Sequence, residues 1–241
     1  MVPITPYDVS QNFTTGGDVA VYTLNGAPSW MEISASEGII TGTPDDFVNT
    51  SGITVTGTNT SGSDTSNAFS TNMVEFAFTI RTIGASESFT VPGRSGQPYN
   101  GTIDYGDGSP TESFSAFDDP NFTHIYADAD DYQIKITGIF STIYFNNTGD
   151  LNATISVENW GDVGWNRLDS AFFGCLNLTT ITATDGQNLS GAGQCGSAFR
   201  GAGLTALDTS TWDTTNAQDI AFFVFQCDDL VTLNLNGFNT G

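Results

Sequence analysis

The strongest constraint on the fold is an internal repeat in the last third of the chain. Apolar residues recur there at a fixed spacing of 26 positions, which predicts one repeat for each turn of a coil. Because stacked coils place equivalent residues above one another, we expect a continuous core with Phe199, Leu204 and Leu207 in its middle layer. The columns are Phe173, Phe199 and Phe225; Leu178, Leu204 and Leu230; and Ile181, Leu207 and Leu233.

The residues around these columns resemble the BspA-type leucine-rich repeats of surface proteins. The family's AF-x-GC-x-NL and LDTS-x-WDTSN signatures are matched by Phe173–Leu178 (FGCLNL), Phe225–Leu230 (FQCDDL) and Leu207–Asn216 (LDTSTWDTTN). Asn159-Trp160-Gly161 followed by Trp165 resembles the usual entry to such an array. The resemblance implies a short leucine-rich-repeat solenoid over residues 159–241.

Residues 233–241 look like the middle of a coil rather than its end. A solenoid needs a terminal cap over its last apolar layer. We therefore expect either further residues in the natural protein or a partner chain that covers this end.

Residues 1–73 carry short strand signals punctuated by glycine and proline. Val19–Val21 and Ile53–Val55 are two such signals, with turn residues between them, as a small sandwich requires. Ala27–Trp30 (APSW) followed by Gly38–Pro44 (GIITGTP) resembles the Ig-like, cadherin-like modules of bacterial and phage surface proteins. The resemblance implies a β-sandwich with Trp30 in its core. The alternative is that Trp30 serves as a ligand platform.

Residues 74–158 predict a second set of strands. Val74, Phe76, Phe78 and Ile80 alternate with polar residues or alanine, and residues 134–136 and 143–145 are further candidates. Asp104–Ser109 (DYGDGS), His124–Tyr126 (HIY) and Tyr132 resemble polycystic-kidney-disease-type (PKD-like) β-sandwich modules, which are spacers and adhesion units. His124 is the only histidine, and we favour a structural hydrogen bond beside the Asp-Gly turn over catalysis.

Charge excludes one class of partner. The 27 acidic and 5 basic residues give a net charge of -22, and nucleic acid needs basic side chains to displace its counterions. No apolar run reaches the roughly 18 residues of a membrane span, and Met1–Pro6 lacks the features of a signal peptide. Either a secreted fragment begins at a new methionine, or Met1 is native and the protein reaches the outside within a virus particle, which we favour.

Catalytic sets are not apparent in the sequence. One histidine and no basic cluster leave few acid–base or nucleophile arrangements. Paired carboxylates are common in so acidic a chain, but glycosidase chemistry also needs a cleft. Cys175, Cys195 and Cys227 lack the close spacing of zinc ligands, and at least one thiol is unpaired. We predict no enzyme activity, no Cys175–Cys227 disulfide and three buried thiols.

Calcium is the one cofactor that the sequence leaves open. Turn carboxylates supply the hard oxygen ligands that this ion prefers, although no complete twelve-residue loop is present. The alternative is that these acids only solvate loops. The candidate ligands are Asp128, Asp130, Asp131, Asp104 and Asp107.

These expectations combine into a mainly β chain with two β-sandwich domains, Ig-like and PKD-like, followed by a short solenoid. We expect a non-enzymatic structural or adhesion protein on a virion surface, as a bacteriophage head decoration or fibre component. The alternatives are a bacterial cell-surface BspA-type adhesin and, more weakly, an accessory binding region of a polysaccharide-degrading enzyme. Expected partners are other virion or cell-surface proteins, a host-surface protein or glycan, and a second copy of the chain. Nucleic acid and membrane insertion are not expected.

Overall fold

The computed structural model describes residues 4, 6–13, 21–43, 50–71, 73–187, 189 and 193–238. Within these ranges the chain is mainly β, with two short 3-10 turns and no α-helix. This follows from a sequence rich in turn residues and in β-branched and aromatic residues. The chain divides into two compact units, residues 1–73 and 74–241, and each is described by itself.

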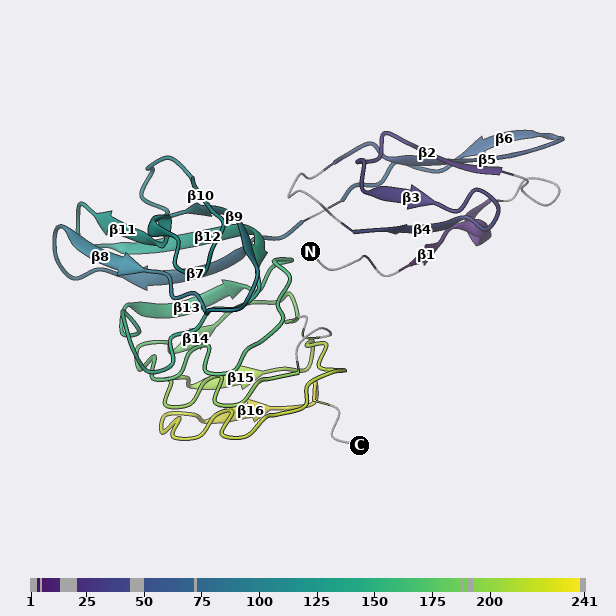
Figure 1. Cartoon of the computed structure of the whole chain (residues 1–241). Coiled ribbons are helices and arrows are strands. Elements are labelled where there is room, and N and C mark those ends of the chain that lie inside the picture. Colours follow the sequence, from purple (N-terminus) through teal and green to yellow (C-terminus); the bar gives the residue numbers. More distant parts are fainter. Residues whose placement is uncertain are drawn as a thin grey trace. The chain divides into compact units, whose positions relative to one another are not determined.

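The first unit contains two antiparallel three-stranded sheets, ordered β1–β4–β3 and β2–β5–β6 (Figure 1). Tyr22, Ile40 and Val55 come from both sheets and belong to one buried apolar cluster. Two sheets that share an apolar core form a sandwich. The elements are β1 (Tyr7–Asp8), η1 (Ser10–Asn12), β2 (Val21–Asn25), β3 (Met31–Ile33), β4 (Ile39–Gly42), β5 (Thr54–Asn59) and β6 (Gly62–Thr65).

The tryptophan and glycine residues that carry the Ig-like resemblance of this unit lie together. Trp30 is buried, with 9% of its surface exposed, as the resemblance to Ig-like modules implies. A Cβ atom on Gly42 would lie 2.3 Å from the Trp30 carbonyl oxygen, so only glycine fits this position. Val19, Ala20 and Pro44, which also belong to the predicted pattern, lie outside the described residues.

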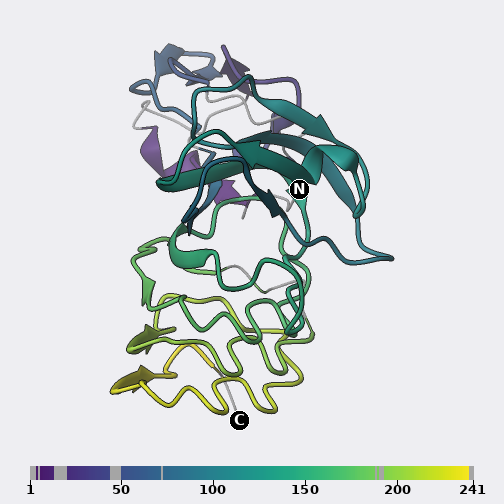
Figure 2. The same cartoon turned by 90° about the vertical axis from the view of Figure 1, so that its left-hand side faces the viewer.

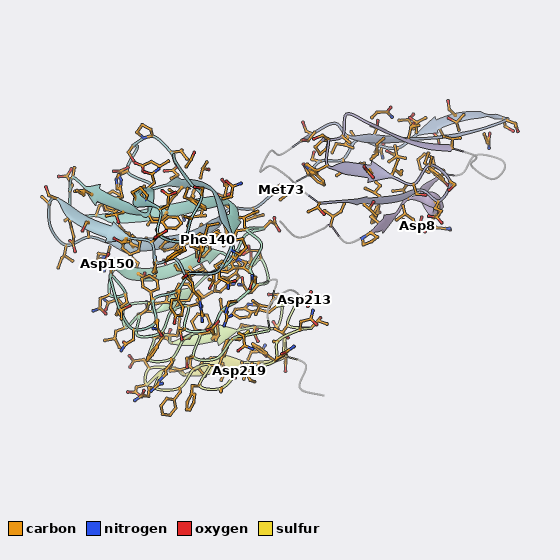
Figure 3. The ribbon with its side chains drawn as sticks, in the orientation of Figure 1. Asp8, Met73, Phe140, Asp150, Asp213 and Asp219 are labelled. Atoms are coloured by element: carbon orange, nitrogen blue, oxygen red, sulfur yellow. The ribbon has the colours of Figure 1, made fainter. Side chains whose placement is uncertain are left out.

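The second unit begins with a larger sandwich. Its main sheet has the order β10–β9–β12–β7–β13–β14, and the opposing sheet pairs β11 with β8. The interior is aromatic, and Phe140, labelled in Figure 3, packs against the rings of Phe76, Tyr99 and Phe122. The elements are β7 (Phe76–Arg81), β8 (Glu87–Thr90), β9 (Tyr99–Asp104), β10 (Glu112–Phe114), η2 (Pro120–Phe122), β11 (Thr123–Tyr126), β12 (Asp131–Phe140), β13 (Thr154–Asn159) and β14 (Thr180–Ile181).

One predicted strand of this sandwich does not form. Residues 143–145 have no strand pairing, although Ile143 and Phe145 are buried. The reason is that residues 143–145 pack against the first turn of the coiled part of the chain instead of pairing with a strand of the sandwich. The Phe145 amide donates to the Ala171 carbonyl at 3.0 Å, and its ring lies 6.1 Å from that of Phe172.

The rest of the second unit winds into stacked coils. We define coil 1 as residues 168–194, coil 2 as residues 195–219 and coil 3 as residues 220–238. Backbone hydrogen bonds join each coil to the next, as from the Phe172 amide to the Ala198 carbonyl and from the Phe199 amide to the Phe223 carbonyl. Each coil has one short strand at the same edge of the stack, namely β14, β15 (Ala206–Asp208) and β16 (Thr232–Asn234) (Figures 1 and 2).

The predicted middle layer is confirmed for three side chains. Phe199 and Leu204 are fully buried in coil 2, and Leu207 is 2% exposed. The ring of Phe199 is parallel to that of Phe172, 5.6 Å away, and meets Phe223 at a right angle. Stacked coils therefore share one apolar interior, as the leucine spacing predicts.

The predicted phenylalanine column is wrong. Phe173 is half-buried and Phe225 is 49% exposed, while Phe172 occupies the core position equivalent to Phe199. The physical reason is a turn of unequal length. Gly174 and Leu178 are four positions apart, but their equivalents in coil 2, Gly201 and Leu204, are three apart. Local spacings are thus 27 and then 25 residues around a mean of 26.

The sandwich and the coils are joined by one strand and one tryptophan pair. β13 pairs antiparallel with β7 of the sandwich and parallel with β14 of coil 1, so the proposed boundary at residues 158/159 falls at the end of a shared strand. Trp165 lies 4.8 Å from the Phe76 ring, and its Nε1 donates to the Trp160 carbonyl at 2.7 Å. Trp160 in turn meets Trp212 of coil 2 at 5.3 Å.

Burial of Leu204 predicts a large loss of stability when its side chain is truncated. Leu204→Ala should lower the free energy of unfolding by about 2–5 kcal/mol, because it removes buried methyl groups and leaves a cavity. Val231→Ala is the control, since Val231 is 88% exposed and should change stability by less than about 0.5 kcal/mol. Denaturant unfolding followed by tryptophan fluorescence measures both, and equal midpoints for the two variants would contradict the stacked core.

Candidate binding surface on the stacked coils

The carboxylates predicted to bind calcium lie on two turns of the larger sandwich. Asp131 forms a bidentate ion pair with Arg81, with N–O distances of 2.6 and 2.7 Å. Asp130 and Asp104 accept backbone hydrogen bonds from Asp131 and Gly106. Asp128 accepts through its carbonyl oxygen from the Thr82 hydroxyl at 3.0 Å.

Most of these oxygens therefore already hold protein donors. Among the described residues, no group of three or more His, Cys, Asp or Glu side chains has the arrangement of a metal site. Calcium stays a prediction that rests on the sequence alone. In the same ranges, no helix is long and apolar enough to cross a membrane.

His124 and Asp107 form the hydrogen bond beside the Asp-Gly turn that the sequence predicts. His124 Nε2 lies 2.8 Å from Asp107 Oδ2, and the imidazole stacks on Tyr105 with ring centroids 4.3 Å apart. Partial burial opposes ionisation of Asp107, but hydrogen bonds from Ser109 and His124 outweigh it and lower its pKa to about 2. The arrangement fixes the turn against Tyr105 and Tyr126.

The cysteines are free thiols, as predicted, but the prediction that all three are buried holds only for Cys175 and Cys195. Cys175 and Cys195 are buried and Cys227 is half-buried. Burial raises the pKa of all three, for Cys195 to about 12. Since the thiolate is the reactive form, these groups pack as small apolar side chains rather than act as nucleophiles.

An unusual surface feature lies on the outer face of the coils. Residues equivalent in the stack alternate there between aromatic and cationic side chains: Phe173 in coil 1, Arg200 in coil 2 and Phe225 in coil 3. The Arg200 guanidinium carbon lies 4.9 Å from the Phe173 ring centroid and 5.4 Å from that of Phe225. Phe222 adds a third ring at 5.5 Å. We call Phe173, Arg200, Phe222, Phe225 and Gln226 the aromatic–arginine cluster.

Two rings of this cluster face solvent. In coil 3, the last coil of the described residues, Phe222 is 58% exposed and Phe225 is 49% exposed, whereas their equivalents in coils 1 and 2 are half-buried; the two rings meet edge to face at 5.4 Å. Gln226 is exposed as well, and its Oε1 accepts from Arg200 Nη2 at 3.5 Å. Neighbouring exposed apolar side chains of this kind mark interaction sites more often than scattered single ones do.

The charge of Arg200 is not neutralised by a carboxylate. Arg81, Arg94, Lys135 and Arg167 all form ion pairs with Asp or Glu, whereas none joins Arg200 to an acid in the described part of the chain. Arg200 Nε is also covered and lacks a hydrogen-bond acceptor there. In a chain of net charge -22, this guanidinium keeps unused donor capacity.

The backbone under the cluster is strained. Ser170, Ser197 and Phe222 occupy equivalent left-handed positions, with φ of 56°, 59° and 58°. A second left-handed column holds Gly174, Gly201 and, in coil 3, Gln226 with φ of 62°. Side chains with a Cβ pay roughly 1–2 kcal/mol for this conformation, and bulky ones are outliers.

Packing does not offset this strain well. A cation–π contact at an exposed site contributes about 0.5–1 kcal/mol, and the Phe222 ring stays mostly in water. Coils 1 and 2 use small residues at the same two backbone positions, which shows that the stack does not require Phe and Gln there. Such a local cost is a reason to look for a function at this surface.

Sequence reasoning missed this surface because it assigned Phe173 and Phe225 to the core. The sequence does contain a signal that Phe173 and Phe225 are not core residues. Their equivalent in the coil between them is Arg200, and a charged residue would not occupy a column of buried apolar side chains. The run Phe222-Phe223-Val224-Phe225 also holds more large apolar residues than one inward-facing position can bury.

The lowered pKa of Asp107 predicts a pH-dependent share of stability. A carboxyl with a folded pKa of about 2 and an ordinary value of 3.8 stabilises the fold above pH 4, and that share disappears as the pH falls toward 2. Asp107→Asn should lower the free energy of unfolding by about 1 kcal/mol at pH 6, because solvent screens the carboxylate of this exposed residue, and by almost nothing at pH 2. Asp118→Asn, on a nearby exposed loop, controls for the loss of one charge. Equal losses at both pH values would contradict this assignment.

Comparison with known proteins identifies only the first unit. Residues 2–74 match the model of a protein family described as "Putative Ig domain". No curated protein and no solved structure matches the chain. The match to residues 2–74 identifies the first unit as an Ig-like module, in agreement with its two-sheet fold.

Proposed function

We propose that this protein is a non-enzymatic structural and adhesion protein displayed on a surface, with the coils as its binding part. The aromatic–arginine cluster carries this proposal, because it sets exposed rings and an unpaired guanidinium on a regular stack of coils. Sites on rigid, hydrogen-bonded elements hold their side chains more reproducibly than sites on free loops. The β-modules before the coils would then serve as spacers and anchor.

The finer module assignments belong to this proposal. We propose that residues 74–158 are a PKD-like module, supported by the contacts of His124 with Asp107 and Tyr105. We propose that residues 159–241 are BspA-type leucine-rich repeats, supported by stacked coils with Leu178 and Leu204 buried in them. The family comparison covers neither segment, so these assignments rest on motifs and packing.

For the setting, we propose the surface of a bacteriophage particle, in a head decoration or a fibre. A surface protein is favoured by the segments Ala27–Trp30 and Gly38–Pro44, which resemble the Ig-like modules of bacterial and phage surface proteins. The strongly acidic composition keeps such a chain soluble and away from nucleic acid. A bacterial cell-surface adhesin is the second candidate and shares the same modules.

Antibodies against the coils distinguish these settings. Immunogold electron microscopy of particles and of host cells should label particle surfaces in the phage setting and cell surfaces in the adhesin setting. Label on neither surface would contradict display altogether.

We further expect the Ig-like module to be the anchoring side. Removal of residues 1–73 should abolish incorporation into the assembly and leave the second unit folded, because residues 74–241 form a compact unit of their own. Incorporation is measured by blotting purified particles or cell envelopes, and folding by the tryptophan fluorescence of the truncated chain. Full incorporation of the truncated chain would place the anchor in the second unit instead.

A further inference from the structure

The aromatic–arginine cluster contains two kinds of binding group, and together they restrict what can dock there. Phe222 and Phe225 offer apolar rings, while Arg200, whose Nε is covered, offers its terminal Nη donors without a carboxylate partner. A guanidinium fork matches the two oxygens of a carboxylate, and such bidentate pairs are strong and directional. The complementary group is therefore one carboxylate next to an apolar side chain.

A protein partner fits these groups better than a sugar or a membrane does. Sugars present many hydroxyls, whereas the polar groups of the cluster are limited to Arg200 and Gln226, and its rings have no polar edge. A membrane surface of anionic lipids would repel this chain, because its net charge is -22. Phe and Arg are both enriched where proteins contact one another.

The equivalent positions of the coils support a role beyond packing. The left-handed position of Phe222 is held by Ser170 and Ser197 in the other coils, and that of Gln226 by Gly174 and Gly201. Both departures from small residues occur in coil 3, and both place side chains around Arg200. A binding role for the cluster would explain both the Phe at position 222 and the Gln at position 226.

We propose that the aromatic–arginine cluster is the docking point for a protein partner that presents one carboxylate beside an apolar side chain. The carboxylate pairs with the Arg200 guanidinium, and the apolar side chain packs on Phe222 and Phe225. This inference rests on the proposed function and names the partner chemistry of its binding part.

The arginine side chains give a direct readout. The chain has four arginines, and three of them, Arg81, Arg94 and Arg167, are ion-paired with aspartates. A ¹H–¹⁵N spectrum of the arginine Nε–H groups of the full chain therefore offers four signals, with three internal references. Arg200→Lys identifies the Arg200 signal by its disappearance.

The probes are two blocked dipeptides that differ in one group. Acetyl-Asp-Phe-amide should shift the Arg200 signal saturably, and acetyl-Asn-Phe-amide should bind about tenfold more weakly, because it lacks the carboxylate. Methyl β-glucoside is the sugar probe and should leave the Arg200 signal unmoved. An equal or larger shift with the glucoside, or no shift with either peptide, would overturn the proposal.

A variant of Phe222 separates docking from packing. Phe222→Ser installs the residue that coils 1 and 2 carry at the same left-handed position, so the midpoint of unfolding should stay or rise. Binding of the Asp-Phe peptide should fall about tenfold, as the exposed ring is lost. Arg81→Ala removes an exposed arginine elsewhere and should leave binding unchanged. Lower stability with unchanged binding in Phe222→Ser would show a packing role and refute the proposal.

The outcome is independent of where the protein is displayed. Peptide binding without surface label would overturn the proposed setting alone. Surface label without any peptide shift would overturn the docking point alone.

Discussion

The second unit depends on strand β13, which belongs to two structures at once. Its antiparallel pairing with β7 closes the sandwich, and its parallel pairing with β14 begins the stack of coils. Trp165 adds a packed joint by touching Phe76 of the sandwich and donating to Trp160. A second joint is ionic, since Asp169 of coil 1 holds both Arg167 and Arg94, the latter from the sandwich. The coils thus inherit their orientation from a strand rather than from a linker, and the outer-face cluster is fixed on that base.

Sequence patterns predicted the mainly β character, the Ig-like first unit and the layer of Phe199, Leu204 and Leu207, because each depends on local spacing. They also predicted the free thiols and a structural hydrogen bond of His124 beside the Asp-Gly turn, whose partner the structure identifies as Asp107. The candidate surface could not be predicted in this way. It depends on which neighbouring coil residues meet across the stack, and that is set by turn lengths. It also depends on ion pairs such as Arg81–Asp131, whose partners lie 50 positions apart.

The charge distribution explains why one arginine stands out. Arg81, Arg94 and Arg167 each form an ion pair with an aspartate of the second unit. Such pairs contribute to stability mainly when the contact is bidentate, as for Arg81, or when one carboxylate binds two arginines, as Asp169 does. Arg200 instead lies between the rings of Phe173 and Phe225, and no carboxylate of the described residues forms an ion pair with it. Cation–π contacts keep the guanidinium in place without satisfying its donors. The aromatic neighbours therefore both position this charge and leave it free to pair.

The phase of the coils links their core to their surface. Inward and outward columns are adjacent in sequence, as Phe172 is to Phe173 and Phe199 to Arg200. A turn shortened or lengthened by one residue changes the spacing without breaking the ladder of hydrogen bonds, as the shorter turn after Gly201 demonstrates. Substitution at an outward position then alters the surface while the inward neighbour maintains the stack. A repeated coil can therefore change what it binds at little cost to its fold, provided that strained positions such as Phe222 stay few.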